Sequence, residues 1–398
     1  MSQKKLVIYL GLILSICAQW IILKFSGITL HTPWNAVAPG VAIFGAAFLL
    51  SWAAELAQFE IPEALAISFL AFIAVLPEYA VDAYFAWEAA KDPQYIHYAT
   101  ANMTGANRLL IGMGWATVIF AYYFRSKKTK VVLPKTSRID LMALTLATLY
   151  CFIIPIKGTL TYWDSIVLLS IFALYIFKQS QTHHAEPEVE GPVAVLAKLP
   201  RGRRIFVTVL LFFISGFTIF IAAEPFAEGL LESGRRFGVE EFILVQWLAP
   251  LASESPEFIV AIIFALNKKP TASLSTLVSS KVNQWTLLVG MLPLIYSFSA
   301  GQILPMGLDA RQSEEILLTV AQSFFAIAVI ANLSISLWEA LILFGLFATQ
   351  LFFTSGAVRH VYAYVYIGLA FLLLLTQKEN RRGLYAVMRE TFTLSAKH

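Results

Sequence analysis

The stretch VLPEYA at residues 75–80 places a proline followed by Glu78 inside an apolar segment that is otherwise suited to hydrocarbon. The stretch SESPEF at residues 253–258 repeats this pattern with Glu257. Proline removes a backbone donor and opens a helix, so nearby carbonyl groups lose their partners and become available to a cation beside the glutamate. A charged side chain at membrane depth is costly unless a positive partner meets it. Each glutamate therefore marks a candidate functional site.

The composition of the chain places it among integral membrane proteins. Of its 398 residues, 58% are hydrophobic and only 14% are charged, and the mean hydropathy is +0.71. The net charge of +4 comes largely from basic connecting loops, so it reports membrane topology and gives no reason to expect nucleic acid. No phosphate-binding loop of the Gly-Lys-Ser or Gly-Lys-Thr type is present, and we infer no ATP site, other cofactor or protein partner.

Apolar runs near or above the roughly 20 residues that a bilayer crossing needs predict an all-α protein with about twelve transmembrane helices. A polar linker at residues 179–204 divides them into two halves. The predicted spans are 6–23, 37–58, 62–89, 96–124, 138–156, 160–178, 205–233, 239–266, 271–297, 314–333, 336–354 and 359–376.

The distribution of basic residues predicts the orientation of these spans. The segment 125–138, the linker and the tail around Arg381 all fall on the side that holds Lys4. Because basic loops stay in the cytoplasm, we expect cytoplasmic N- and C-termini and location in the plasma (inner) membrane. Arg235 and Arg236 fall on the outer side and disagree with this rule.

The two halves resemble each other beyond the Pro-Glu pairs. VLP at residues 132–134 corresponds to ILP at 303–305, and LLIG at 109–112 corresponds to LLVG at 287–290. Five helices per half is an odd number, so the second copy inserts with the opposite orientation and the halves form an inverted repeat. The predicted organisation is an extra helix and loop at 1–36, a first repeat at 37–178, a linker at 179–204, a second repeat at 205–354 and an extra helix with a tail at 355–398.

Two repeats, each with Pro-Glu inside one helix and Asn or Ser near the middle of the next, resemble the calcium/cation antiporters that include the sodium/calcium exchangers. The resemblance covers roughly residues 37–354. It implies a secondary transporter and not an enzyme, in which two glutamates bind the transported cation with the help of hydroxyl, amide and backbone oxygens. Carried onto this chain, it implies Glu78 and Glu257 as metal ligands, with help from Ser253, Ser255, Asn102, Asn107, Ser280, Asn283 and Gln284.

The chain departs from the family pattern at IAV, residues 73–75, where the family has Gly-Thr-Ser, so one flank of the site has no side-chain oxygen. Two further acids add to the candidate ligands. Asp82 lies one helical turn after Glu78. Glu254 lies three residues before Glu257, so each pair shares a helix face if the helix is intact. Such hard oxygen ligands suit calcium or a similar cation, although sodium and protons use the same atoms.

Two cationic residues, Arg108 and Lys281, lie near the middle of predicted spans, where their side chains cannot easily reach the membrane surface. Arg108 keeps its charge, which favours a fixed ion pair with an acid. Lys281 is more adaptable. It can alternate between occupying a cation site as a tethered ammonium and releasing that site to an ion.

The sequence therefore predicts a secondary active antiporter that exchanges calcium or a similar small cation for sodium or protons. Ions would bind between the two Pro-Glu sites at the membrane midplane, and access would alternate between the two sides. Two alternatives stay open. The missing hydroxyls and Lys281 are compatible with a sodium/proton antiporter. A membrane scaffold or sensor that does not transport could keep the same fold with its site closed by salt bridges.

Overall fold

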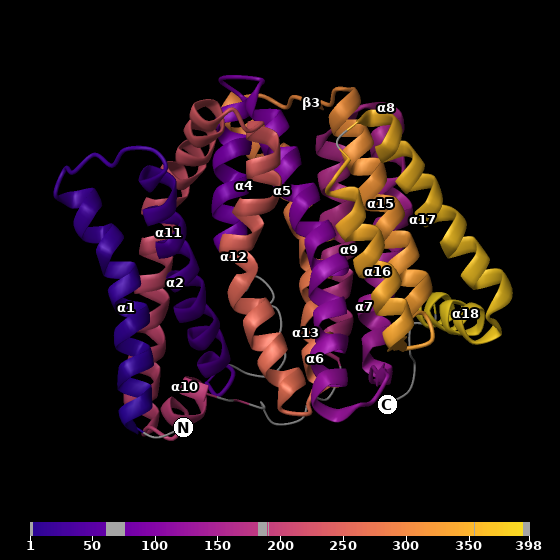
Figure 1. Ribbon diagram of the computed structural model, residues 1–398, viewed down its shortest axis with the longest axis horizontal. Coiled ribbons are helices and arrows are strands. Elements are labelled where there is room, and N and C mark those ends of the chain that lie inside the picture. The colour runs from indigo at the N-terminus through magenta and orange to yellow at the C-terminus, as the bar shows by residue number, and fades with distance from the viewer. Residues whose placement is uncertain (1–2, 61–75, 182–188, 190, 354, 393–398) are drawn as a thin grey trace. The chain divides into compact units, whose positions relative to one another are not determined.

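The computed structural model describes residues 3–60, 76–181, 189, 191–353 and 355–392, and these are mostly helical (Figure 1). The helices are α1 Gln3–Phe25, α2 Trp34–Ala57, α4 Leu76–Ala89, α5 Tyr95–Leu109, α6 Ala116–Ser126, α7 Arg138–Cys151, α8 Ile153–Lys157, α9 Tyr162–Gln179, α10 Gly191–Leu196, α11 Arg201–Phe237, α12 Glu241–Leu266, α13 Pro270–Asn283, α14 Val289–Ala300, α15 Ala310–Ile330, α16 Leu337–Gln350, α17 Gly356–Thr376 and α18 Lys378–Phe392. Shorter elements are the π-helical segments η1 Leu110–Trp115 and η3 Gln284–Leu288, the 3₁₀ turn η2 Lys135–Ser137, and the strands β1 Lys130–Val132, β2 Thr159–Leu160, β3 Met306–Gly307 and β4 Ser334–Ser336.

Helices occupy each of the twelve predicted spans, although residues 62–75 of the third span lie outside the described part of the chain. Seven of the described helices are long and apolar enough to cross a membrane, or eight if the bent α12 is counted. These helices agree with a multi-pass membrane protein. Twelve crossings and the inverted repeat stay predictions.

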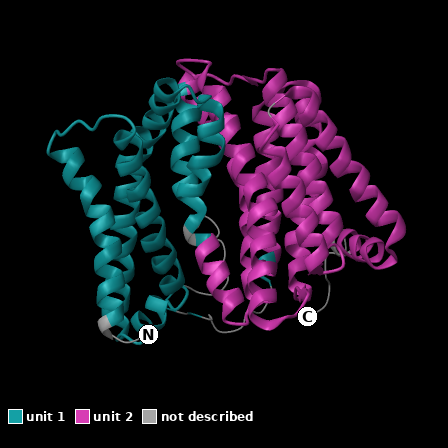
Figure 2. Cartoon of the chain, in the orientation of Figure 1, with its two compact units in different colours: residues 1–88, 179–257 teal, residues 89–178, 258–398 magenta. Residues whose placement is uncertain are grey.

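The chain forms two compact units (Figure 2). Unit 1 consists of residues 1–88 and 179–257 and contains α1, α2, α4, α10, α11 and the first part of α12. Unit 2 consists of residues 89–178 and 258–398 and contains the other helices and the four short strands. Each unit draws on both predicted repeats, so the repeat boundaries stay a prediction of the sequence.

The core of unit 1 lies between α1, α2, α10 and α11. Leu49, Trp52 and Leu211 are buried there. The expected polar linker contributes to this core as well, because Val193 and Leu196 of α10 are buried in it.

Glu60 links the segment after α2 to the start of α11. Its carboxylate lies 2.5 Å from Arg204 Nη2 and 3.1 Å from Arg201 Nε. Burial would raise the pKa of Glu60, but the hydrogen bonds and charges of Arg204 and Arg201 outweigh it and hold the pKa below its usual range. These contacts therefore stabilise the ionised form of Glu60.

In unit 2, α15 packs against α5, α7 and α17 and is buried along most of its length. Two antiparallel strand pairs tie the connections between helices. Strand β1 pairs with β4, so that Val131 lies opposite Ile335. Strand β2 pairs with β3, so that Leu160 lies opposite Met306. Each pair therefore joins the first half of the chain to the second.

The close approach of α2 and α11 predicts that Gly229 tolerates no side chain. An added Cβ would lie 2.7 Å from the backbone of Ala36. We expect Gly229→Ala to lower the free energy of unfolding by about 1–3 kcal/mol, because two helix backbones must separate. Thermal unfolding of the purified protein measures this loss.

Gly216 on the same helix provides the matched control, because nothing lies within 4 Å of its added Cβ. Gly216→Ala should leave the unfolding temperature unchanged or slightly higher, since alanine favours helix. Equal losses in the two variants would show that the approach of α2 and α11 is not the cause.

Candidate functional site

The first Pro-Glu pair lies at the beginning of the described part of α4. Pro77 follows Leu76, the first described residue of this helix, and residues 61–75 before it lie outside the described part of the chain. Glu78 is 2% exposed and Asp82, one turn later, is 1% exposed. The two acids are therefore both buried, as a shared helix face predicts. Residues 61–75, which include the IAV triplet, lie outside the described residues.

The second Pro-Glu pair lies at a bend in α12. The helix consists of two parts that meet at Pro256, one ending at Ser255 and the other beginning at Glu257. Proline is a common cause of such a bend because it breaks the internal hydrogen-bond ladder. Glu254 is buried and Glu257 is partly buried.

The two serines before this bend donate their hydroxyl protons to their own helix. Ser253 Oγ donates to the carbonyl of Ala249 at 3.1 Å. Ser255 Oγ donates to the carbonyl of Leu251. A hydroxyl that has donated its proton still carries two oxygen lone pairs. Both serines therefore keep the acceptor atoms that a cation would need.

The predicted amides of the first half lie on α5. Asn102 is 0% exposed, and its side-chain oxygen and nitrogen have no hydrogen-bond partner among the residues that the structure describes. Buried polar groups are nearly always paired, so an unpaired buried amide indicates a binding function. Asn107 is also buried, and its Nδ2 donates to the carbonyl of Met103 at 2.8 Å. This bond turns Oδ1 into the available end of the amide.

Lys281 on α13 donates a hydrogen bond to this Oδ1 atom of Asn107. Its ammonium nitrogen lies 2.6 Å from Asn107 Oδ1 and 3.4 Å from the Asn107 carbonyl oxygen. The side chain is 1% exposed, and Nζ also lies 4.4 Å from the centre of the Trp285 ring. A cation therefore already sits on one of the oxygens that the sequence assigned to a transported cation. The three other candidates are also buried, namely Ser280 and Asn283 at the end of α13 and Gln284 at the start of η3.

A π-helical segment follows each of these two helices. The segment η1 directly follows α5, and η3 directly follows α13. A π-helical turn is rare, and it is frequent at functional sites because it widens the helix and shifts the backbone hydrogen bonds. The two halves thus place the same unusual feature directly after the helices that carry Asn107 and Asn283.

The candidate residues divide between the two units (Figure 2). The four acids and the two serines belong to unit 1, and they are Glu78, Asp82, Ser253, Glu254, Ser255 and Glu257. The amides, Ser280 and the two central cations belong to unit 2, and they are Asn102, Asn107, Arg108, Ser280, Lys281, Asn283 and Gln284.

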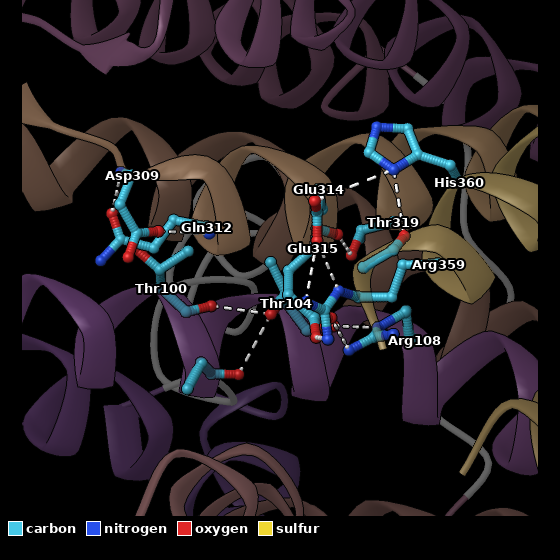
Figure 3. A network of polar contacts seen from close by, with 12 residues as sticks. Thr100, Thr104, Arg108, Asp309, Gln312, Glu314, Glu315, Thr319, Arg359 and His360 are labelled. Carbon is cyan, nitrogen blue, oxygen red and sulfur yellow. Dashed lines mark hydrogen bonds and ion pairs between the residues drawn. The ribbon is translucent and has the colours of Figure 1, made fainter. Parts of the chain in front are cut away.

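The second central cation, Arg108, has a partner that the sequence did not indicate. Its Nη2 lies 2.5 Å from Glu315 Oε2, and both side chains are buried (Figure 3). Gln322 Nε2 adds a bond of 3.3 Å to the Arg108 carbonyl. The predicted fixed ion pair of Arg108 is therefore present. Its acid, however, lies on α15 and is none of the four proposed ligands.

A third helix joins this network. Arg359 of α17 lies 2.8 Å from Glu314 and 3.7 Å from Glu315 (Figure 3). Two guanidinium groups and two carboxylates balance each other, so these four side chains carry no net charge. Arg108 is thus committed to a network of its own, whereas Lys281 lies directly on a proposed ligand.

Hydropathy gave no sign of these partners because Glu315 and Arg359 fall at the ends of predicted spans, where charged residues are ordinary. Asp140 was missed for the same reason. Its Oδ1 accepts hydrogen bonds from Ser279 Oγ at 2.9 Å and Tyr175 OH at 3.0 Å, and the side chain is buried. Asp140 thereby joins α7, from the first half of the chain, to α13 at Ser279, one helical turn before Asn283.

A family model described as sodium/calcium exchanger protein matches residues 30–181 and 207–356. The chain belongs to this family. The predicted resemblance is therefore confirmed, and the protein is a multi-pass membrane protein of the secondary cation exchangers, which act on small cations and are not enzymes.

Solved structures agree with this membership. One is a crystal structure described as the H⁺/Ca²⁺ exchanger CAX, whose sequence is 44% identical to this chain. The match covers 97% of this chain and 98% of that chain, with a TM-score of 0.94. Native YfkE has 14% identity and a TM-score of 0.64, over 87% of this chain and 99% of that one. The sodium–calcium exchanger NCX_Mj has 15% identity and a TM-score of 0.54, over 81% and 100%. At this low identity, the similarity to YfkE and NCX_Mj shows a shared fold and nothing about function. The comparison with curated protein sequences gives no match.

The buried pair of Arg108 and Glu315 predicts strong energetic coupling. Glu315→Leu should lower the free energy of unfolding by about 3–5 kcal/mol, because it leaves a guanidinium buried without its closest carboxylate. Arg108→Met in the same protein should recover most of this loss. A double-mutant cycle of unfolding free energies measures the coupling. Losses that simply add would mean that the two side chains do not stabilise each other.

Proposed function

We propose that the protein is a secondary active antiporter that exchanges calcium for protons by alternating access. Two lines support calcium as the transported ion. The candidate ligands are carboxylate, hydroxyl and amide oxygens, which are the ligands of hard cations. The 44% identical relative is described as an H⁺/Ca²⁺ exchanger.

The observation that carries the proposal is the contact of 2.6 Å between Lys281 Nζ and Asn107 Oδ1. A second cation bound about 4 Å from this ammonium would be opposed by about 4 kcal/mol at an effective dielectric constant near 20. The tethered ammonium thus takes a position that a mobile sodium ion would otherwise fill. Fewer cations are then bound together, which favours protons over sodium as the coupling ion.

We assign the transported cation to a site that both Pro-Glu pairs share. Glu78 and Glu257 are its principal ligands, with Asp82 and Glu254 beside them. The further ligands that we propose for the cation are Ser253, Ser255, Asn102, Asn107, Ser280, Asn283 and Gln284. Burial of all but Ser255 and Glu257 supports the assignment, because polar side chains are costly at membrane depth unless they bind something. The unpaired amide of Asn102 supports it in particular.

The strand pairing supports an inverted arrangement of the repeats. In the first repeat β1 lies between the third and fourth predicted helices, whereas its partner β4 lies between the fourth and fifth of the second repeat. The pair β2 and β3 makes the reciprocal connection. One membrane crossing separates the two connections of a repeat, so they emerge on opposite sides. Repeats of opposite orientation would give such pairing, and alternating access around a central site uses this arrangement.

We place the protein in the plasma (inner) membrane with both termini in the cytoplasm. The positive charge of the loops supports this orientation. The two arginines that disagree with it are held locally in unit 1. Arg235 Nε lies 2.7 Å from Glu241 Oε1, and Arg236 Nη1 donates to the carbonyl of Thr32 at 3.3 Å.

Replacing either principal carboxylate should abolish exchange. We expect Glu257→Gln and Glu78→Gln to reduce calcium uptake to background while the protein still inserts, because a neutral amide cannot balance a divalent ion. The measurement is radiolabelled calcium uptake into proteoliposomes under imposed proton, sodium or potassium gradients, with a pH dye inside. Glu60→Gln is the control, because Glu60 lies after α2 and pairs with Arg201 and Arg204.

Each outcome of this experiment decides one alternative. Wild-type uptake by a well-folded Glu257→Gln protein would remove that residue from the site. Uptake that follows the sodium gradient and ignores the proton gradient would overturn proton coupling. Proton movement driven by sodium without calcium would favour a sodium/proton antiporter, and no flux in any gradient would favour a scaffold.

Lys281 provides a second test, directed at the coupling ion. Lys281→Asn removes the ammonium and adds an oxygen, so it should raise the number of cations bound or shift coupling from protons toward sodium. Lys281→Met removes the same charge without adding a ligand, so sodium coupling should stay weaker in this control. The charge moved per calcium ion in vesicles measures the change. An unchanged ratio with intact flux in both variants would limit Lys281 to a structural role.

A further inference from the structure

The helix α18, Lys378–Phe392, follows α17 after the single residue Gln377. Gln377 has an extended backbone, with φ −99° and ψ 105°, so the chain changes direction there. Figure 1 shows α18 running across the direction of the other helices of unit 2. Because α17 is long and apolar enough to span a membrane, α18 begins where a bilayer surface would lie.

One face of α18 is fixed to the end of α15. Asn380 is 0% exposed, and its Nδ2 donates to the carbonyls of Ala328 at 2.8 Å and Val329 at 3.1 Å. Its Oδ1 accepts from Asn332 Nδ2 at 2.9 Å. These bonds satisfy carbonyls in the last turn of α15, which a helix end leaves without internal partners.

Two further positions of this face leave no room for rotation of α18. At Gly383 an added Cβ would lie 2.0 Å from the Ala331 carbonyl oxygen. Val387 is also buried. Asn380, Gly383 and Val387 follow one another at three and four residues, which is the spacing of one helix face. The docked face therefore fixes which residues point away from the protein.

The opposite face carries the basic residues. Arg382 lies two residues after Asn380, a rotation of about 200° around the helix axis. Lys378, Arg382, Tyr385 and Arg389 follow one another at four, three and four residues, and all are exposed, Tyr385 by 70%. Including Arg381, the helix has four basic residues against the two acids Glu379 and Glu390, and thus a net charge of +2.

The position of α18 selects the partner of this basic face. In Figure 1 the lower ends of α6 and α13, in the same unit, extend beyond the level of α18. The helix therefore lies at the edge of the helical layer, where lipid headgroups surround a membrane protein. Arginine binds phosphate through paired hydrogen bonds, and tyrosine favours the membrane interface. A soluble acidic partner fits less well, because one residue after a span leaves α18 no reach beyond the bilayer surface.

We propose that α18 is an interfacial helix that binds anionic phospholipid headgroups through Lys378, Arg382 and their basic neighbours. Because Asn380 bonds to the end of α15, lipid binding that holds α18 in place also stabilises the position of α15. The same helix carries Glu315, the partner of Arg108 on α5. Anionic lipid therefore stabilises the unit that contains Lys281 and Asn107. The proposal is independent of which ions are exchanged.

A fluorescent label at α18 tests the lipid preference directly. Both native cysteines, Cys17 and Cys151, are buried, so Tyr385→Cys provides a single exposed site for a bimane label. The labelled full-length protein is reconstituted with phosphatidylcholine or phosphatidylglycerol that carries a nitroxide near the top of the acyl chain. We expect the nitroxide on phosphatidylglycerol to quench several-fold more effectively at equal lipid fraction.

Charge removal shows whether the basic face causes the preference. Lys378→Gln with Arg382→Gln should lower the preference for phosphatidylglycerol by about fivefold per residue, up to its complete loss. Lys128→Gln with Lys130→Gln removes the same charge from the exposed loop and strand after α6, so it should leave the preference unchanged. An equal loss in both pairs would show a general effect of net charge and overturn the assignment to α18.

Salt dependence gives a second measurement, in which all basic residues of α18 stay in place. Raising the ionic strength from about 0.1 M to about 1 M shortens the Debye length from about 10 Å to about 3 Å, and should weaken the preference strongly. Equal quenching by the two lipids at low salt would overturn the proposal. Aqueous iodide provides a further check. If it quenched the label as strongly in phosphatidylglycerol bilayers as in phosphatidylcholine bilayers, the proposal would also be overturned. The label on α18 would then face water, as expected for a helix that binds a soluble partner.

Discussion

A polar or charged group inside hydrocarbon must find its partner within the protein, and this constraint organises unit 2. The ammonium of Lys281 finds such a partner in the side-chain oxygen of Asn107, which lies 174 residues earlier in the sequence. That contact joins the two helices that carry the candidate amides, one from each half of the chain. The rings and oxygens around Lys281 can hold a cation, so the same physical requirement that packs these helices also produces an environment suited to ions.

Buried charges in unit 2 occur in two arrangements with different consequences. Arg108, Arg359, Glu314 and Glu315 form a balanced network in which every charge has an opposite charge within reach. Removing either member of the buried pair Arg108 and Glu315 would leave the other charge buried without its closest partner. Lys281 instead contacts a neutral amide, and the amide of Asn102 has no hydrogen-bond partner among the described residues. The unpaired amide of Asn102 is the kind of buried polar group that indicates a binding function.

The short strands and the π-helical segments have meaning beyond local structure because they occur in corresponding places of the two halves. Each segment follows the helix with the candidate amides, and each strand pair joins the halves reciprocally. These features are what the proposed inverted repeat would produce. The proposed repeat would also account for the contribution of both halves to each compact unit.

Hydropathy and proline placement, which are local properties, determined the membrane class, the helices, the bend of α12 and the family resemblance. They also indicated that Arg108 and Lys281 would need internal partners. Which partners these are depends on packing between helices that lie far apart in sequence. Glu315 is separated from Arg108 by 207 residues, and at the start of an apolar run nothing local distinguishes a buried acid from a solvated one. The docked face of α18 likewise exists only because the end of α15 presents carbonyls to Asn380. Tertiary structure alone decided these contacts, because hydrogen bonds are directional and short, whereas hydrophobic patterns specify only which surfaces avoid water.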